Sequence, residues 1–472
     1  MASGQAAVAA AGTLPTELLC LIFSFLDGPP PSDDRLHEQP RRDMLRASRC
    51  LLKNVSRVSK RWRAVVLPTL FRHVVWSLDW LELQDPDLVD ELPLLAFLRT
   101  SGLGRHVQSF AIIVSHTTLP SKQRSETPGS SSASSSARRF AVSGAAWTPP
   151  GILDPSFAIY NEDYNWLWNA LFKLVDPLRF TIIASPQTLA RLFASALFIG
   201  DADLFASEEQ FHILSLSRES RSTPAPPPPT QPPNVPAAAP NSGCGGARRP
   251  AERQHIPVAL FTLRPWSHLL LNENSSIRAY RNYEYFAKNP PSILDPLLIS
   301  SGDGGLTTSN SPCLLPPTVR SLAYVAIFPL ALHFRKLTRH LPRLDRLFVQ
   351  LAPRNDILRD PAEMDHVQPA DLWLERQECY ESILFRLAHA PPAAPPHGGQ
   401  LPLQPPSGAL DDGGDDSDDF NILREARNWS LLRRLETGDA HDDADWWQWM
   451  VQQMLAGRRD WRVEREGVFV RT

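Results

Sequence analysis

The stretch Thr13-Leu-Pro-Thr-Glu-Leu-Leu-Cys-Leu-Ile-Phe-Ser-Phe-Leu26 combines the start signals of a helix with an unusually wide apolar face. Pro15 suits the first turn, where a missing N–H costs nothing, and Glu17 favours the positive end of the helix dipole. The apolar residues form two adjacent stripes, Leu18, Ile22 and Phe25 on one and Leu19, Phe23 and Leu26 on the next. Either the rest of the chain or a partner must cover so much apolar surface.

A second helix is expected from about Leu45 to Val66, and Pro68 is expected to end the helical pattern. Its apolar positions at helical spacing are Leu51, Val55, Val58 and Trp62. The other faces carry a row of basic residues, Lys53, Arg57, Lys60, Arg61 and Arg63. That row is either a solvated face or a surface that meets an acidic partner. A helical unit this small is not expected to bury all its large apolar groups unaided.

Leu14-Pro-x-Glu-Leu-Leu-x-x-Ile-Phe-Ser-Phe-Leu26, with Val58-Ser-Lys-Arg-Trp-Arg63 and Leu70-Phe71 after it, resembles an F-box over residues 13–76. The resemblance implies docking on the Skp linker protein, and through it on a cullin, with Leu14 and Pro15 in direct contact. Four further residues would form the helical core or the edge of the interface, Ile22, Leu26, Val58 and Trp62. Leu18 completes the expected linker-binding set.

One departure from the F-box pattern is the segment DGPPPSDDRLHEQPRRDMLRASRC, residues 27–50, between the two halves. The family usually joins these halves by a short turn. Its proline-rich start and mixed charges predict a loop bulging from the domain, which the fold tolerates because lengthening a loop costs little entropy. If the loop projected over the docking face, it would weaken linker binding.

The rest of the chain alternates short extended runs with helical ones. Strands are expected at 106–114, 177–184, 319–327 and 344–351, and helices at 166–175, 186–198 and 332–341. Such units in series predict a mixed α/β fold with a parallel sheet backed by helices, and more narrowly a leucine-rich-repeat-like arc. This partner-binding domain would span 77–390 and 420–472. Disordered loops are expected near 121–150, 220–250 and 300–317, and an acidic, proline-rich one at 391–419.

Aromatic residues mark three places in this region. Trp446, Trp447 and Trp449 predict a helix that packs on the domain or forms a partner-binding patch, followed by a final strand at 461–470. Tyr280, Tyr283, Tyr285 and Phe286 serve either core packing or recognition. The segments 278–286 and 371–375 resemble the C-terminal regions of fungal F-box proteins, which implies an architecture and no particular target.

Charge, cysteine content and hydropathy limit the kinds of function that this chain can have. The 472 residues carry a formal net charge of -3, which gives no case for nucleic-acid binding. The five cysteines form no close pair, and no apolar run is long enough for a membrane span. We therefore expect a protein of the cytosol or nucleus with no metal or cofactor. No catalytic motif is present.

The expected function is that of a non-catalytic adaptor that recruits a protein substrate to a Skp–cullin–F-box ubiquitin ligase. Two alternatives remain open. One is a Skp-binding regulatory or scaffold protein outside a ligase, and the other is an unrecognised hydrolase on the α/β region. A concave pocket with converging histidine and carboxylate groups would favour the hydrolase, and a filled region would argue against it.

Overall fold

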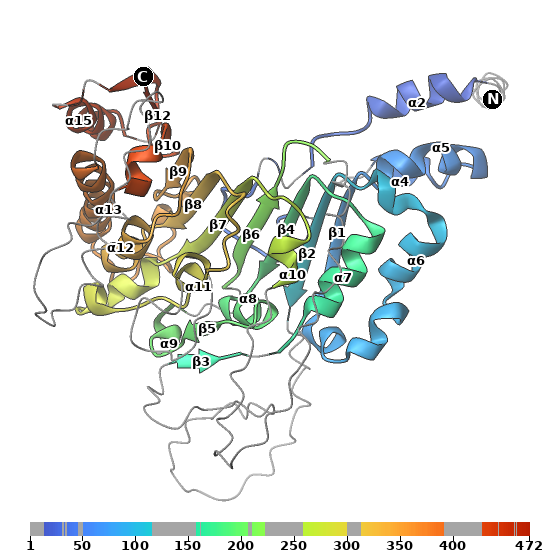
Figure 1. Cartoon of the computed structure of the whole chain (residues 1–472), viewed down its shortest axis with the longest axis horizontal. Coiled ribbons are helices and arrows are strands. Elements are labelled where there is room, and N and C mark those ends of the chain that lie inside the picture. The colour runs from blue at the N-terminus through green and yellow to red at the C-terminus, as the bar shows by residue number, and fades with distance from the viewer. Residues whose placement is uncertain are drawn as a thin grey trace, which may run out of the picture.

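The computed structural model describes residues 14–30, 33, 35–45, 51–115, 157–160, 162–205, 210–221, 258–299, 313–390, 427–441, 443–456, 458 and 460–472. A small helical unit precedes a large sheet flanked by helices, so the predicted mixed α/β class is confirmed (Figure 1). The expected loops at 121–150 and 391–419 lie outside the described residues, as do most of 220–250 and 300–317.

The helical unit consists of α2 (Thr16–Ser24), α4 (Leu51–Val55) and α5 (Lys60–Leu70). The large sheet is built from β1 (His73–Asp79), β2 (Ser109–Ser115), β4 (Arg179–Ala184), β6 (His212–Ser217), β7 (His268–Ser275), β8 (Ser321–Ile327), β9 (Arg346–Gln350), β10 (Arg434–Thr437), β11 (Trp461–Arg465) and β12 (Val468–Arg471). Two short strands, β3 (Phe157–Ile159) and β5 (Ala196–Phe198), pair separately.

The connections contain the remaining helices. The α-helices are α6 (Pro93–Ser101), α7 (Asn165–Leu174), α8 (Pro186–Leu192), α9 (Ala202–Phe205), α10 (Ala259–Thr262), α11 (Leu294–Leu298), α12 (Ala331–Arg339), α13 (Pro369–His389) and α15 (Ala444–Leu455). The 3-10 turns are η1 (Trp80–Leu83), η2 (Pro86–Glu91), η3 (Leu103–His106), η4 (Ile277–Arg281), η5 (Tyr285–Ala287) and η6 (Asp356–Arg359).

Strands of the sheet follow chain order, β1-β2-β4-β6-β7-β8-β9-β10, and end in the hairpin β12-β11. Neighbours are parallel from β1 to β4 and from β7 to β10, whereas β6 runs against both β4 and β7. Because of this reversal, no uniform strand–helix repeat runs through the sheet. The helical unit lies at the β1 edge, and α15 with the final hairpin lies at the opposite edge (Figure 1).

Both faces of the central strands are buried, which explains their continuous apolar runs. Side chains alternate along a strand, and on β2 the residues Phe110, Ile112 and Val114 join the main core under the helices. Ala111 and Ile113 point to the other face, where Leu36, Met44 and Leu45 cover them. That cover comes from residues 35–45, which we call the strap.

Polar bonds attach the strap to the sheet. The Asn272 side chain on β7 donates to the carbonyl oxygens of Leu36 and Glu38, both at 2.8 Å. Gln350 on β9 donates to the His37 carbonyl at 3.1 Å, and the His37 ring packs 4.7 Å from that of Phe348. The expectation that 27–50 bulges from the domain is therefore wrong for the strap, because its apolar side chains and backbone carbonyls find partners on the sheet.

Two further expectations need correction. The helix from Leu45 to Val66 is two helices, because Ser59 caps α5 by accepting a hydrogen bond from the Trp62 N–H at 3.1 Å. Pro68 does not end the pattern, since α5 continues to Leu70. The final strand at 461–470 is the hairpin β11–β12, which turns at Gly467 with a positive φ of 74°.

The structure confirms four expected strands: 106–114 overlaps β2, 177–184 contains β4, 319–327 contains β8 and 344–351 contains β9. The expected helices at 166–175 and 332–341 correspond to α7 and α12. The second expected helix, 186–198, stops at Leu192 as α8, and β5 follows. Residues 313–317, expected to be loose, include Leu315 in the main core. The sheet begins at His73, before the expected boundary at residue 76.

Candidate partner-binding surface

The inner side of α2 is packed against the rest of the helical unit. Leu19 and Phe23 are buried together with Leu52 of α4 and Val66 of α5. The rings of Phe23 and Trp62 lie 5.3 Å apart between centroids. Leu14 packs on the edge of the same cluster. Leu14 and Trp62 are therefore half-buried, and they stabilise the helical unit by packing against its core.

The outer side of α2 has no apolar cover among the described residues. Leu18, Leu21, Ile22 and Phe25 follow the spacing of one helical face, and they keep 45, 55, 45 and 81% of their surface exposed. We call these four residues the α2 face. Burying one large apolar side chain contributes about 1.5–3 kcal/mol to stability. Leaving four of them exposed side by side forgoes that free energy unless a partner covers them. Such a patch is typical of a protein-binding site.

The other expected contact residues surround this face or lie near it. Pro15 precedes α2 and is exposed, and Leu26 follows α2 with about a third of its surface exposed. Val58, in the turn between α4 and α5, is 63% exposed. Of the seven predicted linker-binding residues, five are thus exposed, and Leu14 and Trp62 are half-buried against the helical core.

Two members of the α2 face, Leu21 and Phe25, are missing from the residues that the sequence assigned to the interface. Phe25 already lies on the stripe of Leu18 and Ile22 in the sequence, so helical periodicity contained the signal. Leu21 lies three residues after Leu18, which places it on the same side of the helix. The seven expected linker-binding residues come from the F-box resemblance, which does not include Leu21 and Phe25.

Basic side chains form a second exposed feature of the helical unit. Lys53, Arg57, Lys60, Arg61 and Arg63 are all exposed. Two of them also bond within the unit, Arg61 to the carbonyl of Leu14 and Arg63 to that of Ser56 at 3.0 Å. These contacts leave a positive rim on the unit, which suits encounter with an acidic protein.

Comparison with known proteins agrees with this geometry. Residues 11–75 match the model of the F-box-like family. The chain carries an F-box-like domain. No curated protein and no solved structure matches the chain. At the level of the family, the F-box-like domain is the part of an adaptor that binds a Skp-type linker, and in this protein it consists of α2, α4 and α5.

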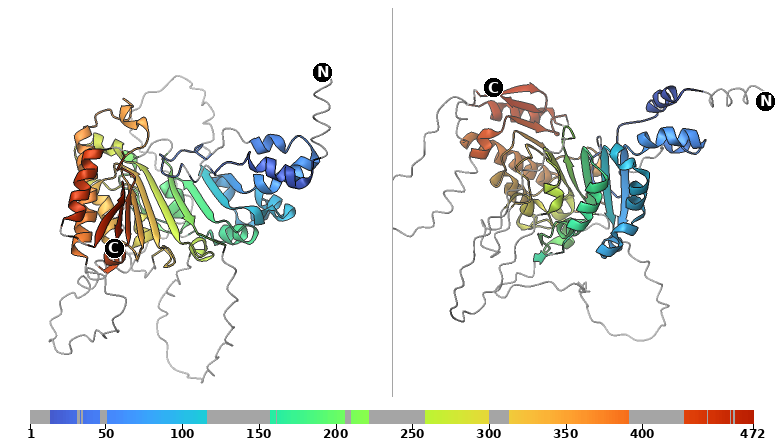
Figure 2. Two further views of the ribbon diagram at one scale, coloured as in Figure 1. Left: turned by 90° about the horizontal axis from the view of Figure 1, so that it is seen from above. Right: turned by 45° about the vertical axis from the view of Figure 1, so that its right-hand side comes forward.

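The F-box-like domain is joined firmly to the sheet. Asp27, just after α2, pairs with Arg72, just after α5, at 2.6 Å. Arg72 leads directly into β1, and the carbonyl of Arg72 accepts hydrogen bonds from Gln108 and Ser109. Phe71 stacks on Phe97 of α6 with 5.3 Å between ring centroids. These contacts attach the F-box-like domain to the β1 edge of the sheet, beside which it lies (Figure 2).

Histidine and carboxylate groups converge at one place in the sheet. The Glu273 carboxylate accepts hydrogen bonds from Tyr324 at 2.6 Å and Ser292, and lies 2.9 Å from His333 Nε2. Burial alone would raise the pKa of Glu273, but His333, the nearby His212 and the hydrogen bond from Ser292 lower it to about 2. Beside the carboxylate, His212 is buried and its pKa is lowered to about 4 by burial.

This cluster does not have the geometry of a serine-hydrolase site. The adjoining cavity holds about 10 Å³, which is room for about one water molecule. Ser292 contacts the carboxylate directly, whereas a serine nucleophile needs a histidine base beside it. The region is filled, and the cluster joins β7, β8 and α12 in the core. Within the described ranges no group of three histidine, cysteine or acidic residues could hold a metal, and no helix is long and apolar enough to cross a membrane.

Proposed function

We propose that this protein is an adaptor that docks on the Skp linker through the α2 face and delivers a protein substrate to a Skp–cullin ubiquitin ligase. The exposure of four large apolar side chains inside the region matched by the F-box-like family carries the proposal. Pro15, Leu26 and Val58 would extend the contact at its margins. The chain itself would supply binding and positioning, and the catalysis would belong to the assembled ligase.

The join between the F-box-like domain and the sheet supports the adaptor role. An adaptor has to hold its substrate at a fixed place relative to the linker, and the Asp27–Arg72 pair and the Phe71–Phe97 stack oppose free rotation. The sheet domain is the part we expect to bind the substrate, because the F-box-like domain is occupied by the linker. We place this activity in the cytosol or nucleus, with no part for nucleic acid or membrane.

The test is affinity capture of the tagged full-length chain from cells of its own organism, followed by mass spectrometry. Wild type is compared with Leu18→Asp/Ile22→Asp and with Leu81→Asp. Leu81 is 61% exposed on η1, so it matches the exposure and the chemistry of the change outside the α2 face. Two buried carboxylates without partners weaken an interface by more than a hundredfold.

Wild type and the Leu81→Asp variant should recover the linker, a cullin and a set of further proteins, and the double variant should lose linker and cullin. Equal recovery of the linker by the double variant would contradict docking through the α2 face. Recovery of the linker without any cullin would contradict delivery to a ligase and favour a regulatory Skp-binding protein.

A further inference from the structure

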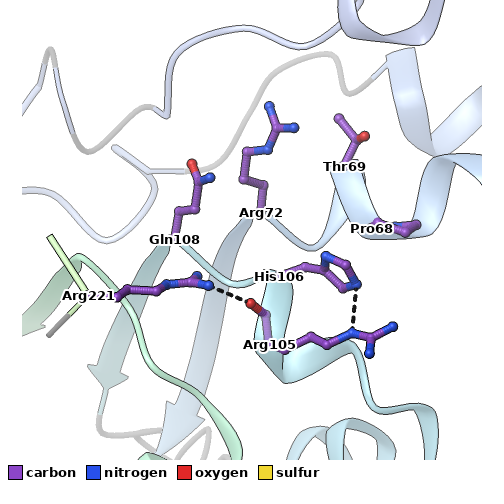
Figure 3. A pocket seen from close by; sticks show the side chains of 7 residues that line it. All are labelled: Pro68, Thr69, Arg72, Arg105, His106, Gln108 and Arg221. Atoms are coloured by element: carbon purple, nitrogen blue, oxygen red, sulfur yellow. Dashed lines mark hydrogen bonds between the residues drawn. The ribbon is translucent and has the colours of Figure 1, made fainter. Parts of the chain in front are cut away.

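A basic pocket lies where the F-box-like domain meets the sheet (Figure 3). Its cavity measures about 160 Å³. It is lined by Pro68, Thr69, Arg72, Arg105, His106, Gln108 and Arg221. These residues come from the end of α5, from η3 and the turn into β2, and from the segment after β6. A single water needs about 10–15 Å³ of such space, so the pocket admits a larger group.

Charge in the pocket is strongly positive. Three guanidinium groups line it, and Asp27 at 2.6 Å from Arg72 offsets one of them, so two positive charges are left unbalanced. The pKa of His106 responds to this positive charge. Burial lowers the pKa of its imidazole, and Arg105, Arg221 and Arg72 lower it further. Among the described residues, no acidic side chain lines the cavity itself.

Hydrogen bonds within the protein orient these side chains. Arg221 donates to the carbonyl oxygens of Arg105 at 2.8 Å and Val107 at 2.7 Å, and Arg105 Nε lies 3.1 Å from His106 Nε2. A guanidinium has five N–H groups, and these bonds use one or two from each arginine. Thr69 and Gln108 add a hydroxyl and an amide to the lining.

We propose that this pocket binds a phosphate monoester group. Two unbalanced positive charges match a phosphate monoester, which carries close to two negative charges at neutral pH. Guanidinium groups bind phosphate oxygens in pairs of charge-assisted hydrogen bonds, and the neutral donors can reach the remaining oxygens. A nucleic-acid backbone fits less well, since it needs basic groups repeated along a groove.

The site is separate from the linker-docking surface, because it shares no residue with the α2 face. It joins three parts of the chain, so a bound phosphate would cross-link the end of α5 to the sheet. Free phosphate and a phosphorylated side chain of another protein present the same chemistry. Binding experiments have to separate these two sources.

Isothermal titration calorimetry on the full-length protein provides the test. The ligands are inorganic phosphate, a capped glycine peptide with one central phosphoserine, the same peptide with serine, and a single-stranded oligonucleotide. The protein variants are wild type, Arg105→Gln, Arg72→Gln and the control Arg359→Gln. Arg359 lies on the surface in η6 and loses the same charge. Circular dichroism confirms folding of each variant.

Wild type and Arg359→Gln should bind phosphate or the phosphopeptide, and Arg105→Gln and Arg72→Gln should each bind about tenfold more weakly, because each removes a charge-assisted hydrogen bond. Stronger binding of the phosphopeptide than of phosphate identifies a protein-borne phosphate as the ligand, and the reverse identifies a free one. Equal affinity in all four proteins, no binding at millimolar concentration, or tighter binding of a single-stranded oligonucleotide would overturn the proposal.

Discussion

At the scale of single residues, α2 separates two roles that the sequence alone merges. Leu19 and Phe23 point into the helical core, while Ile22 and Phe25 point outward. Trp62, which the resemblance places at the core or the interface edge, packs on Phe23 inside the unit. Different residues of one short segment therefore supply the packed core and the exposed apolar face.

Because of this separation, we expect two alanine substitutions to change the unfolding free energy by very different amounts. Trp62→Ala should destabilise the F-box-like domain by about 2 kcal/mol, because it removes a large, half-buried ring that packs on Phe23. Ile22→Ala should change stability by less than about 0.5 kcal/mol, as exposed sites do. Urea unfolding followed by tryptophan fluorescence and by circular dichroism measures both values. A loss of more than 2 kcal/mol in Ile22→Ala would place Ile22 in the core instead.

A second prediction at this scale concerns acid sensitivity. His212 is fully buried, neither ring nitrogen has a hydrogen-bond partner among the described residues, and burial lowers its pKa to about 4 from 6.5. The unfolded chain therefore binds a proton below pH 6.5 that the folded protein rejects until about pH 4. Stability from this residue is complete above pH 6.5 and is lost as the pH falls toward 4.

Between pH 7 and pH 5 this residue should remove about 2 kcal/mol of unfolding free energy. Urea unfolding at the two pH values measures the loss, and His212→Leu should reduce it by that amount. An unchanged pH dependence in His212→Leu would show that the folded state accepts the proton at this site.

At the scale of elements, the strap is the feature that sequence patterns did not reveal. Residues 35–45 look polar and loop-like, and their partners lie far along the chain: Asn272 is 236 positions from Leu36. The strand β7 that carries Asn272 was also missed, because its run Asn272-Glu-Asn274 has the composition of a turn. The two errors share one cause. The polar groups of β7 find their hydrogen-bond partners in the strap and in the buried Glu273 cluster, and such distant partners are invisible in a local sequence pattern.

The strap should detach when its polar anchor is removed. Asn272→Ala leaves the carbonyls of Leu36 and Glu38 without their donor, at a cost of about 1–3 kcal/mol each. Trypsin should then cleave after Arg41 or Arg42, which are exposed on the strap. Limited proteolysis with mass spectrometry compares this variant with Asn282→Ala, whose side chain bonds only locally. Equal cleavage rates in the two variants would contradict anchoring by Asn272.

Elements whose pattern is local were predicted well. β2, β4, β8 and β9 are runs of β-branched and aromatic residues, and α7 and α12 follow at helical spacing. What the sequence did not reveal depends on distant pairing, including the reversed direction of β6 and the hairpin at the C-terminus. The site followed the same rule: the stripe on α2 was visible, whereas the inward position of Leu14 and Trp62 required the packed helices.

For the whole molecule, the structure places the F-box-like domain, with its exposed α2 face, at one edge of a long sheet. The F-box-like domain is held at β1 by the Asp27–Arg72 pair, and the strap crosses the face of the sheet opposite the main core as far as Gln350 on β9. The insertion between the two halves of the F-box-like sequence thus connects that domain to the sheet. A substrate bound on the sheet would keep a fixed position relative to the linker.

The central claim is that the α2 face binds the Skp linker, and direct binding of the purified full-length chain to the purified linker tests it. We predict that Ile22→Asp lowers the affinity at least tenfold, because it buries a carboxylate without a partner. The matched Leu81→Asp variant should bind as wild type does. Wild-type affinity in Ile22→Asp would contradict the account.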